Sequence, residues 1–255
     1  MKPTPETLSP LFDRAAEGYD LLNSLMSLGQ DAAWRRAMVS EIQPGDRVLD
    51  LCCGSARSSV AAAKRSGGLV VGADVSWGML VRGAAHAATA GVRFAAVRAD
   101  AFHLPFQDGA FDVITVAWGL RNLVPEPAAL AEMRRVLGAG GRLLVLDSPS
   151  PEPGPIGAFH RGYVRWIVPA LGRLSADPAA YRYLSESILR FGRAHEVARR
   201  IEAAGFVCQP PRSLTLGAAA LWRAQKTAQS ATNGVALGQS ARAAPVPRQP
   251  SWRER

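Results

Sequence analysis

Two short motifs, at residues 48–56 and 70–74, constrain the fold of this chain more than any other feature. The first reads V-L-D-L-C-C-G-S-A, a buried strand followed by a tight turn of small residues, and the second reads V-V-G-A-D. The interval from Asp50 to Asp74 is close to the roughly 20 residues at which a βαβ unit places a carboxylate on a ribose diol. The two motifs together predict a nucleotide pocket.

Two classes of ligand use this layout, dinucleotides and S-adenosylmethionine (SAM), and the turn favours the second. A dinucleotide needs G-x-G-x-x-G so that its pyrophosphate can approach the backbone at a helix N-terminus. Here Gly54 is a glycine, but Ala56 and Ser59 stand where the later glycines would be. SAM has no phosphate and carries an ammonium group, for which Asp50 is a suitable acceptor. A pocket without a ligand, in which Asp50 only braces the loop, is the alternative.

Composition limits the chain to one α/β domain with additions. The 255 residues are 48% hydrophobic, enough to bury one good-sized core. No apolar run approaches the roughly 18 residues of a membrane span and the N-terminus lacks a signal-peptide core, so we expect a cytoplasmic protein. The net charge of +9 could attract nucleic acid or anionic lipid. Because no dense basic run with interleaved aromatics occurs, we expect no nucleic-acid partner.

The order of apolar segments predicts an open, mostly parallel sheet with helices on both faces. Short apolar runs flanked by helical patterns are typical of strands buried on both sides. Seven strands are expected, at 47–51, 69–73, 92–97, 110–117, 141–146, 206–209 and 218–224. Helices are expected near 31–42, after Ser55, from Ser76, from Pro127 and over 194–204.

Three further segments flank or interrupt this domain. Residues 1–43 are expected to form N-terminal helices on the substrate or membrane side, and the sheet domain covers 44–226. After the loop P-S-P-E-P-G-P, helical patterns predict a cap inserted at about 150–192. Residues 227–255 lack hydrophobic periodicity and are expected to be disordered.

The loops that follow the predicted parallel strands should meet at one edge of the sheet, where open α/β sheets bind ligands. Cys52 and Cys53 are interpreted as small fillers of the first loop, because three cysteines make no disulfide framework. No His, Cys or Asp spacing suggests a metal site.

Six segments resemble the SAM-dependent C-methyltransferases of menaquinone and ubiquinone biosynthesis, over roughly 11–226. They are F-D-R-A-A-E-G-Y-D-L-L-N-S-L-M-S-L-G at 12–29, V-L-D-L-C-C-G-S at 48–55, L-P-F-Q-D-G-A-F-D at 104–112, G-L-R-N at 119–122, G-G-R-L-L-V-L-D at 140–147 and Y-R-Y-L-S-E-S-I at 181–188. The first, fourth and last are the most specific, because they lie outside the nucleotide pocket. The resemblance implies the class I SAM-methyltransferase fold, which is Rossmann-like.

The resemblance also implies how the cofactor is bound. Gly54 and Ser55 would line its methionine end, and Asp74 would take the ribose hydroxyls. Val75 and Met79 would border the adenine. The full expected set is Asp50, Cys52, Gly54, Ser55, Asp74, Val75, Met79, Asp100, Ala101 and Ala117.

A reduced, prenylated quinol such as demethylmenaquinol is the implied substrate, with Arg121 and Asn122 in contact with it. A quinol carbon becomes nucleophilic when the neighbouring hydroxyl, with a pKa near 10, loses its proton. A guanidinium favours that anion, and Asp100 could accept the proton. A structural salt bridge for Arg121 and a helix cap for Asn122 are the alternatives. His103 and His160 are weaker candidate bases.

The turn departs from the family pattern G-T-G-D. Ala56 replaces the second glycine, and Arg57 places a cation near a cationic cofactor. Ala117 stands where several members have Ser. These changes keep two other functions open, a SAM-dependent methyltransferase of another small molecule and a non-catalytic SAM-fold protein. Because a prenylated substrate is apolar, we expect transient peripheral contact with the inner face of a membrane through the N-terminal helices and the cap.

Overall fold

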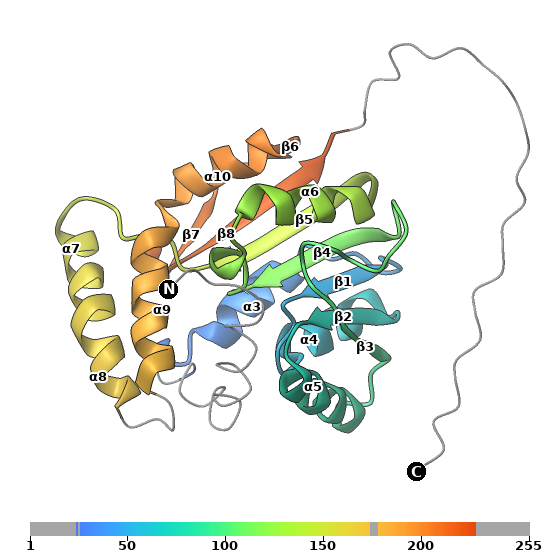
Figure 1. The fold of residues 1–255 in the computed structure, drawn as a ribbon, viewed down its shortest axis with the longest axis horizontal. Helices are drawn as coiled ribbons and strands as arrows, with labels where there is room; N and C mark the ends of the chain where they lie inside the picture. The colour runs from blue at the N-terminus through green and yellow to red at the C-terminus, as the bar shows by residue number, and fades with distance from the viewer. Residues whose placement is uncertain (1–23, 25, 174–177, 228–255) are drawn as a thin grey trace, which may run out of the picture.

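A computed structural model describes residues 24, 26–173 and 178–227, and the strands in this part of the chain form one mixed sheet (Figure 1). The strand order is β3-β2-β1-β4-β5-β8-β6, with β7 paired to β8 outside this path. Residues 1–23 and 25 of the N-terminal helices expected over 1–43, and nearly all of the tail expected over 227–255, lie outside the described residues.

Five strands of the sheet pair parallel with one another, and β8 alone among the described strands runs against the rest. The parallel strands are β1 (Val48–Leu51), β2 (Val70–Asp74), β3 (Phe94–Arg98), β4 (Phe111–Ala117) and β5 (Leu137–Asp147). The others are β6 (Phe206–Cys208), β7 (Arg212–Leu214) and β8 (Ala219–Lys226), of which β8 pairs antiparallel with β5, β6 and β7. The α/β class and the mostly parallel sheet are therefore confirmed.

The described residues contain eight strands where seven were expected. The additional strand, β7, has three residues that are exposed or half-buried, so its sequence shows no alternation of apolar and polar positions. Strand β7 forms because its backbone pairs with β8. A pairing between distant segments produces no recognisable pattern in the local sequence.

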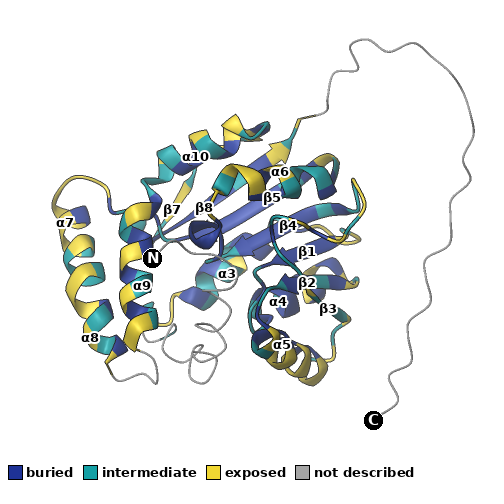
Figure 2. Ribbon diagram, viewed as in Figure 1, coloured by how far each residue is buried: buried dark blue, intermediate teal, exposed yellow. Residues whose placement is uncertain are grey.

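Helices cover both faces of the sheet, as the uninterrupted apolar strands require. Helices α3 (Asp31–Val39) and α4 (Arg57–Ser66) pack on one face, and α6 (Glu126–Val136) and α10 (Ala194–Ala203) pack on the other. Helix α5 (Trp77–Thr89) lies against β2 and β3. Alternate residues of a strand point to opposite faces, so each strand contributes to both cores. Figure 2 shows the central strands buried between the helical layers.

Four helical segments between β5 and α10 stand beside the carboxyl ends of the parallel strands. They are α7 (Pro155–Gly162), the π-helical turn η2 (Tyr163–Ile167), α8 (Val168–Gly172) and α9 (Pro178–Phe191), at the left of Figure 1. We call them the cap. Gly172 lies so close to Tyr181 on α9 that a Cβ atom would overlap the tyrosine, and glycine therefore lets α8 approach α9.

We predict that Trp222→Ala lowers the free energy of unfolding by about 3–5 kcal/mol. The Trp222 side chain on β8 is fully buried, packs edge-on against Phe191 and donates its indole N–H to the Ala194 carbonyl at 2.8 Å. Denaturant unfolding measures the change. Trp166→Ala on the exposed side of the cap is the control, and an equal loss in both variants would contradict the assignment.

Candidate functional site

A cavity of about 240 Å³ opens where the carboxyl ends of β1, β2 and β4 face the cap. One end is polar and is formed by the first turn of α3, the loop after β1 and the end of β2. The other end is largely apolar and is formed by the segment after β4 and by the cap. A single cavity therefore joins the predicted nucleotide pocket to the inserted helices.

The loop between β1 and α4 bends through left-handed backbone conformations. Cys52, Gly54 and Ala56 have φ angles of 56°, 53° and 60°. The Gly54 N–H donates to Asp74 Oδ2 at 2.9 Å, and the Cys53 N–H donates to the Ala73 carbonyl at 3.2 Å. These bonds tie the turn to the end of β2. They help to hold non-glycine residues in a conformation that costs of the order of 1 kcal/mol each.

The Ala56 methyl group, which replaces the hydrogen of the family's second glycine, does not line the cavity. It is fully buried and lies against α5, where a Cβ atom on Gly83 would come within 3.0 Å of it. A small residue at position 83 therefore makes room for the methyl group. The departure at position 56 changes the packing of the turn on α5 rather than the wall of the cavity.

Asp50 and Asp74 both line the polar end. Asp50 is buried and accepts hydrogen bonds from Thr115 Oγ1 at 2.7 Å and Ser59 Oγ at 2.6 Å. Burial raises the pKa of both carboxyl groups, although hydrogen bonds to Asp50 and backbone N–H donors at Asp74 partly oppose the shift. Such groups favour a positively charged ligand, because a nearby cation stabilises their ionised form.

Most of the residues expected at the cofactor are brought together, and two are not. Those on the cavity wall are Asp50, Cys52, Gly54, Ser55, Asp74, Val75, Met79 and Ala117. Asp100 and Ala101 follow β3 and are absent from the wall. The Asp100 carboxylate accepts the Phe102 N–H at 3.0 Å and lies 3.6 Å from the exposed His103 ring.

The cysteines of the turn are poor nucleophiles. Burial raises the pKa of the Cys52 and Cys53 thiols well above the ordinary value, and the Asp74 carboxylate adds to the shift. A neutral thiol neither attacks nor binds metal readily. Within the described ranges, no group of three or more His, Cys, Asp or Glu is arranged to hold a metal ion.

Arg121 and Asn122 lie in the short helix η1 (Leu120–Asn122) and both line the cavity. Arg121 Nη1 donates to Asp147 Oδ1 at 2.6 Å and to the Trp118 carbonyl at 2.9 Å. The arginine and the aspartate are both buried. Arg121 therefore forms a salt bridge with Asp147 and lines the cavity at the same time. Asn122 Oδ1 accepts the Tyr183 hydroxyl from α9 at 3.0 Å.

The apolar end was not predicted residue by residue. It includes Val164 and Val168 of the cap, and Leu184 and Ile188 of α9. Their four-residue spacing is visible in the sequence, but it is equally typical of helix packing. His160 also lines the cavity, whereas His103 does not.

Sequence reasoning missed several residues at the polar end, among them Asp31, Trp34 and Arg35 from α3 and Trp118 after β4. The Arg35 guanidinium lies 4.5 Å from the centre of a Trp118 ring. The separation of Asp31 and Arg35 by four residues indicates a shared helix face. Nothing local indicates that this face meets the cavity.

The model of the ubiE/COQ5 methyltransferase family matches residues 2–226. A demethylmenaquinone methyltransferase of Mycolicibacterium gilvum is 43% identical over 229 residues, covering 89% of this chain and 97% of the relative. One from Mycobacterium tuberculosis strain H37Rv is 41% identical over 220 residues, covering 85% and 91%. The chain belongs to the ubiE/COQ5 methyltransferase family. It is accordingly a methyltransferase.

Solved structures agree with this fold. The [4+2]-cyclase SpnF matches with a TM-score of 0.67 and 19% identity, covering 89% of this chain and 97% of its own. A putative methyltransferase in complex with the Haloferax volcanii Trm112 activator matches with a TM-score of 0.65 and 16% identity, covering 85% and 98%. At these identities the likeness concerns the fold alone.

We predict that wild type loses stability relative to Asp50→Asn as pH rises from about 4.5 to 7.5. The folded protein holds the Asp50 proton above the ordinary pKa of about 3.9, so the unfolded chain releases it first and folding weakens as pH rises. Urea unfolding across this range measures the difference in the free energy of unfolding between the two proteins. Glu186→Gln, at an exposed carboxylate on α9, controls for net charge. A difference independent of pH would contradict the prediction.

Proposed function

We propose that this methyltransferase uses SAM to methylate a ring carbon of a prenylated quinol such as demethylmenaquinol. The observation that carries the proposal is the continuous cavity, in which Arg121 joins a carboxylate-lined polar end to an apolar end formed by the cap. The demethylmenaquinone methyltransferases among its relatives support the same substrate class.

The residues at the polar end fit SAM. Two carboxylates with raised pKa, the buried Asp50 and the half-buried Asp74, line the cavity, which suits a ligand that brings an ammonium and a sulfonium group. Asp74 at the end of β2 is suited to the ribose hydroxyls, and Val75 and Met79 give an apolar wall for adenine. When bound, SAM supplies the electrophilic methyl group.

Arg121 acts on the quinol oxygen in the proposed reaction. The guanidinium is held by Asp147 and by the Trp118 carbonyl, so little reorganisation is needed when negative charge develops beside it. Asn122, bonded to Tyr183, orients the same ring. The apolar residues of the cap exclude water and hold the prenyl chain.

The proton of the quinol needs an acceptor. Asp100, the acceptor expected from the sequence, does not line the cavity, and neither does His103. His160 on α7 does line it. We therefore assign the role of proton acceptor to His160 in place of Asp100.

We expect purified protein with SAM and a reduced, prenylated demethylnaphthoquinol to yield S-adenosylhomocysteine and a product methylated on the ring carbon. Arg121→Lys, which keeps a cation beside Asp147, should lower kcat roughly 100-fold or more, because a single ammonium cannot reproduce the paired donors. Arg182→Gln, at an exposed position of α9, should keep wild-type activity. Mass spectrometry identifies the methylated atom.

Binding of SAM without methyl transfer to any quinol would overturn the substrate assignment in favour of another small molecule. Absence of SAM binding would indicate a protein that has the family fold without its activity.

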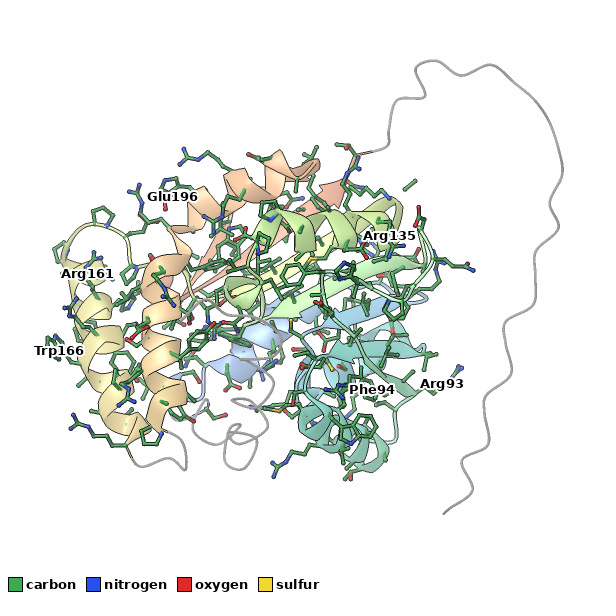
Figure 3. All side chains as sticks on the ribbon, in the orientation of Figure 1. Arg93, Phe94, Arg135, Arg161, Trp166 and Glu196 are labelled. Atoms are coloured by element: carbon green, nitrogen blue, oxygen red, sulfur yellow. The ribbon has the colours of Figure 1, made fainter. Side chains whose placement is uncertain are left out.

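We further propose that the cap brings the cavity to a membrane surface. Ile156, Phe159, Trp166 and Ile167 are exposed at spacings that share a helix face, with Phe159 72% and Trp166 69% exposed. Figure 3 shows Trp166 and Arg161 on the outer side of the cap. No helix in the described residues has the length and apolar character needed to span a bilayer. An interfacial helix with flanking arginines suits an anionic lipid surface.

We predict that the double variant Phe159→Ser/Trp166→Ser loses most of its flotation with vesicles that contain anionic phosphatidylglycerol. Removing two exposed aromatic rings removes the apolar contact, while the cavity wall keeps its residues. Val207→Ser on β6, away from the cap in Figure 1, is the control. Equal flotation of both variants would show that the cap is not the contact surface.

A further inference from the structure

Arg57 stands where the family pattern G-T-G-D has an acid, and it lines the cavity. It begins α4, where a cation is disfavoured because the helix dipole is positive at its N-terminus. The side chain is nevertheless only 26% exposed and lines the polar end beside Gly54 and Ser55. A partly buried cation at the N-terminus of a helix needs negative charge nearby to offset the unfavourable interaction with the helix dipole.

A carboxylate from α3 holds this arginine in position. Asp31 Oδ2 accepts a hydrogen bond from Arg57 Nη1 at 2.8 Å, and Asp31 Oδ1 accepts the Ser24 hydroxyl at 3.2 Å. The Asp31 side chain is 5% exposed, so the pair is shielded from solvent on the α3 side. Within the described residues, Arg57 donates hydrogen bonds only through Nη1. Nε and Nη2 are therefore available for a further acceptor.

A second cation stands nearby. Arg35 Nε on α3 lies 4.0 Å from the same oxygen of Asp31, and its Nη1 donates to Ser58 Oγ in the first turn of α4. Two guanidinium groups thus lie beside one carboxylate where α3 meets α4, and both line the cavity. Asp50 and Asp74 line the same cavity as these two arginines.

This division of charge matches an amino-acid group rather than a simple cation. We infer that Arg57, positioned by Asp31 and assisted by Arg35, binds the α-carboxylate of the methionine part of SAM, an inference that rests on the proposed cofactor. A guanidinium donates two parallel N–H bonds to a carboxylate, and such bonds are the stronger kind of hydrogen bond in proteins. Asp50 in β1 takes the ammonium, and Asp74 at the end of β2 takes the ribose hydroxyls.

The Arg57–Asp31 pair could instead serve only to fasten α3 to α4. The two roles differ in which ligands they affect. S-adenosylhomocysteine carries the carboxylate, whereas 5′-methylthioadenosine shares its nucleoside and thioether but lacks the amino-acid group. A purely structural pair would affect the binding of both ligands equally.

Calorimetry with both ligands tests the inference. Arg57→Gln should raise the Kd of S-adenosylhomocysteine about tenfold or more, because a charged hydrogen bond is lost. It should leave the Kd of 5′-methylthioadenosine within about twofold. Asp31→Asn should also raise the Kd of S-adenosylhomocysteine but not that of 5′-methylthioadenosine. The increase should be smaller than for Arg57→Gln, because Arg57 is still present and loses only the carboxylate that orients it. Lys64→Gln removes the same charge from an exposed site on α4 and should change neither value.

Equal weakening of both ligands by Arg57→Gln would overturn the inference in favour of a structural pair, and so would unchanged binding of S-adenosylhomocysteine. No quinol is present, so the result does not depend on the proposed acceptor. If wild type bound neither ligand, the cofactor assignment itself would be wrong, and the role of Arg57 would be wrong with it.

Discussion

The buried ion pair between Arg121 and Asp147 is the interaction on which the site depends. Two charges removed from water cost several kcal/mol each, and only close contact with further hydrogen bonds offsets that cost. Here the Trp118 carbonyl and the Ser187 hydroxyl complete the arrangement. Because these groups come from the segment after β4, the end of β5 and α9, the pair joins the sheet to the cap. It also keeps a guanidinium on the cavity wall.

Charge is divided across the polar end in a way that the turn sequence alone obscures. Arg57 looks unfavourable beside a cationic cofactor, yet Asp31 from a separate helix partners it. Likewise, the Ala56 methyl group seems to crowd the ligand, but it packs against α5 at Gly83. Residues distant in the chain accommodate both departures from the family pattern: Asp31 pairs with Arg57, and Gly83 leaves room for Ala56. The altered turn therefore fits the rest of the site.

The same fold supports different chemistry, since a cyclase and a putative methyltransferase both superimpose on most of this chain. In the proposed function, the sheet and its turn bind the nucleoside, and the inserted helices select the molecule that enters from the other side. In this chain the cap contributes apolar residues inside and exposed aromatic rings outside. In the proposed function, substrate selection and membrane contact would therefore both depend on this one inserted segment.

The sequence by itself determined the class of fold, the parallel strands and many of the residues that line the cavity, because each follows from a local pattern. A buried strand, a small-residue turn and an acid such as Asp74 are read within a few residues of one another. Only the tertiary structure decided that Asp31 pairs with Arg57, that Asp100 stays off the cavity wall and that β7 adds to the sheet. These outcomes depend on how distant segments pack, and packing leaves no periodic signal in either partner.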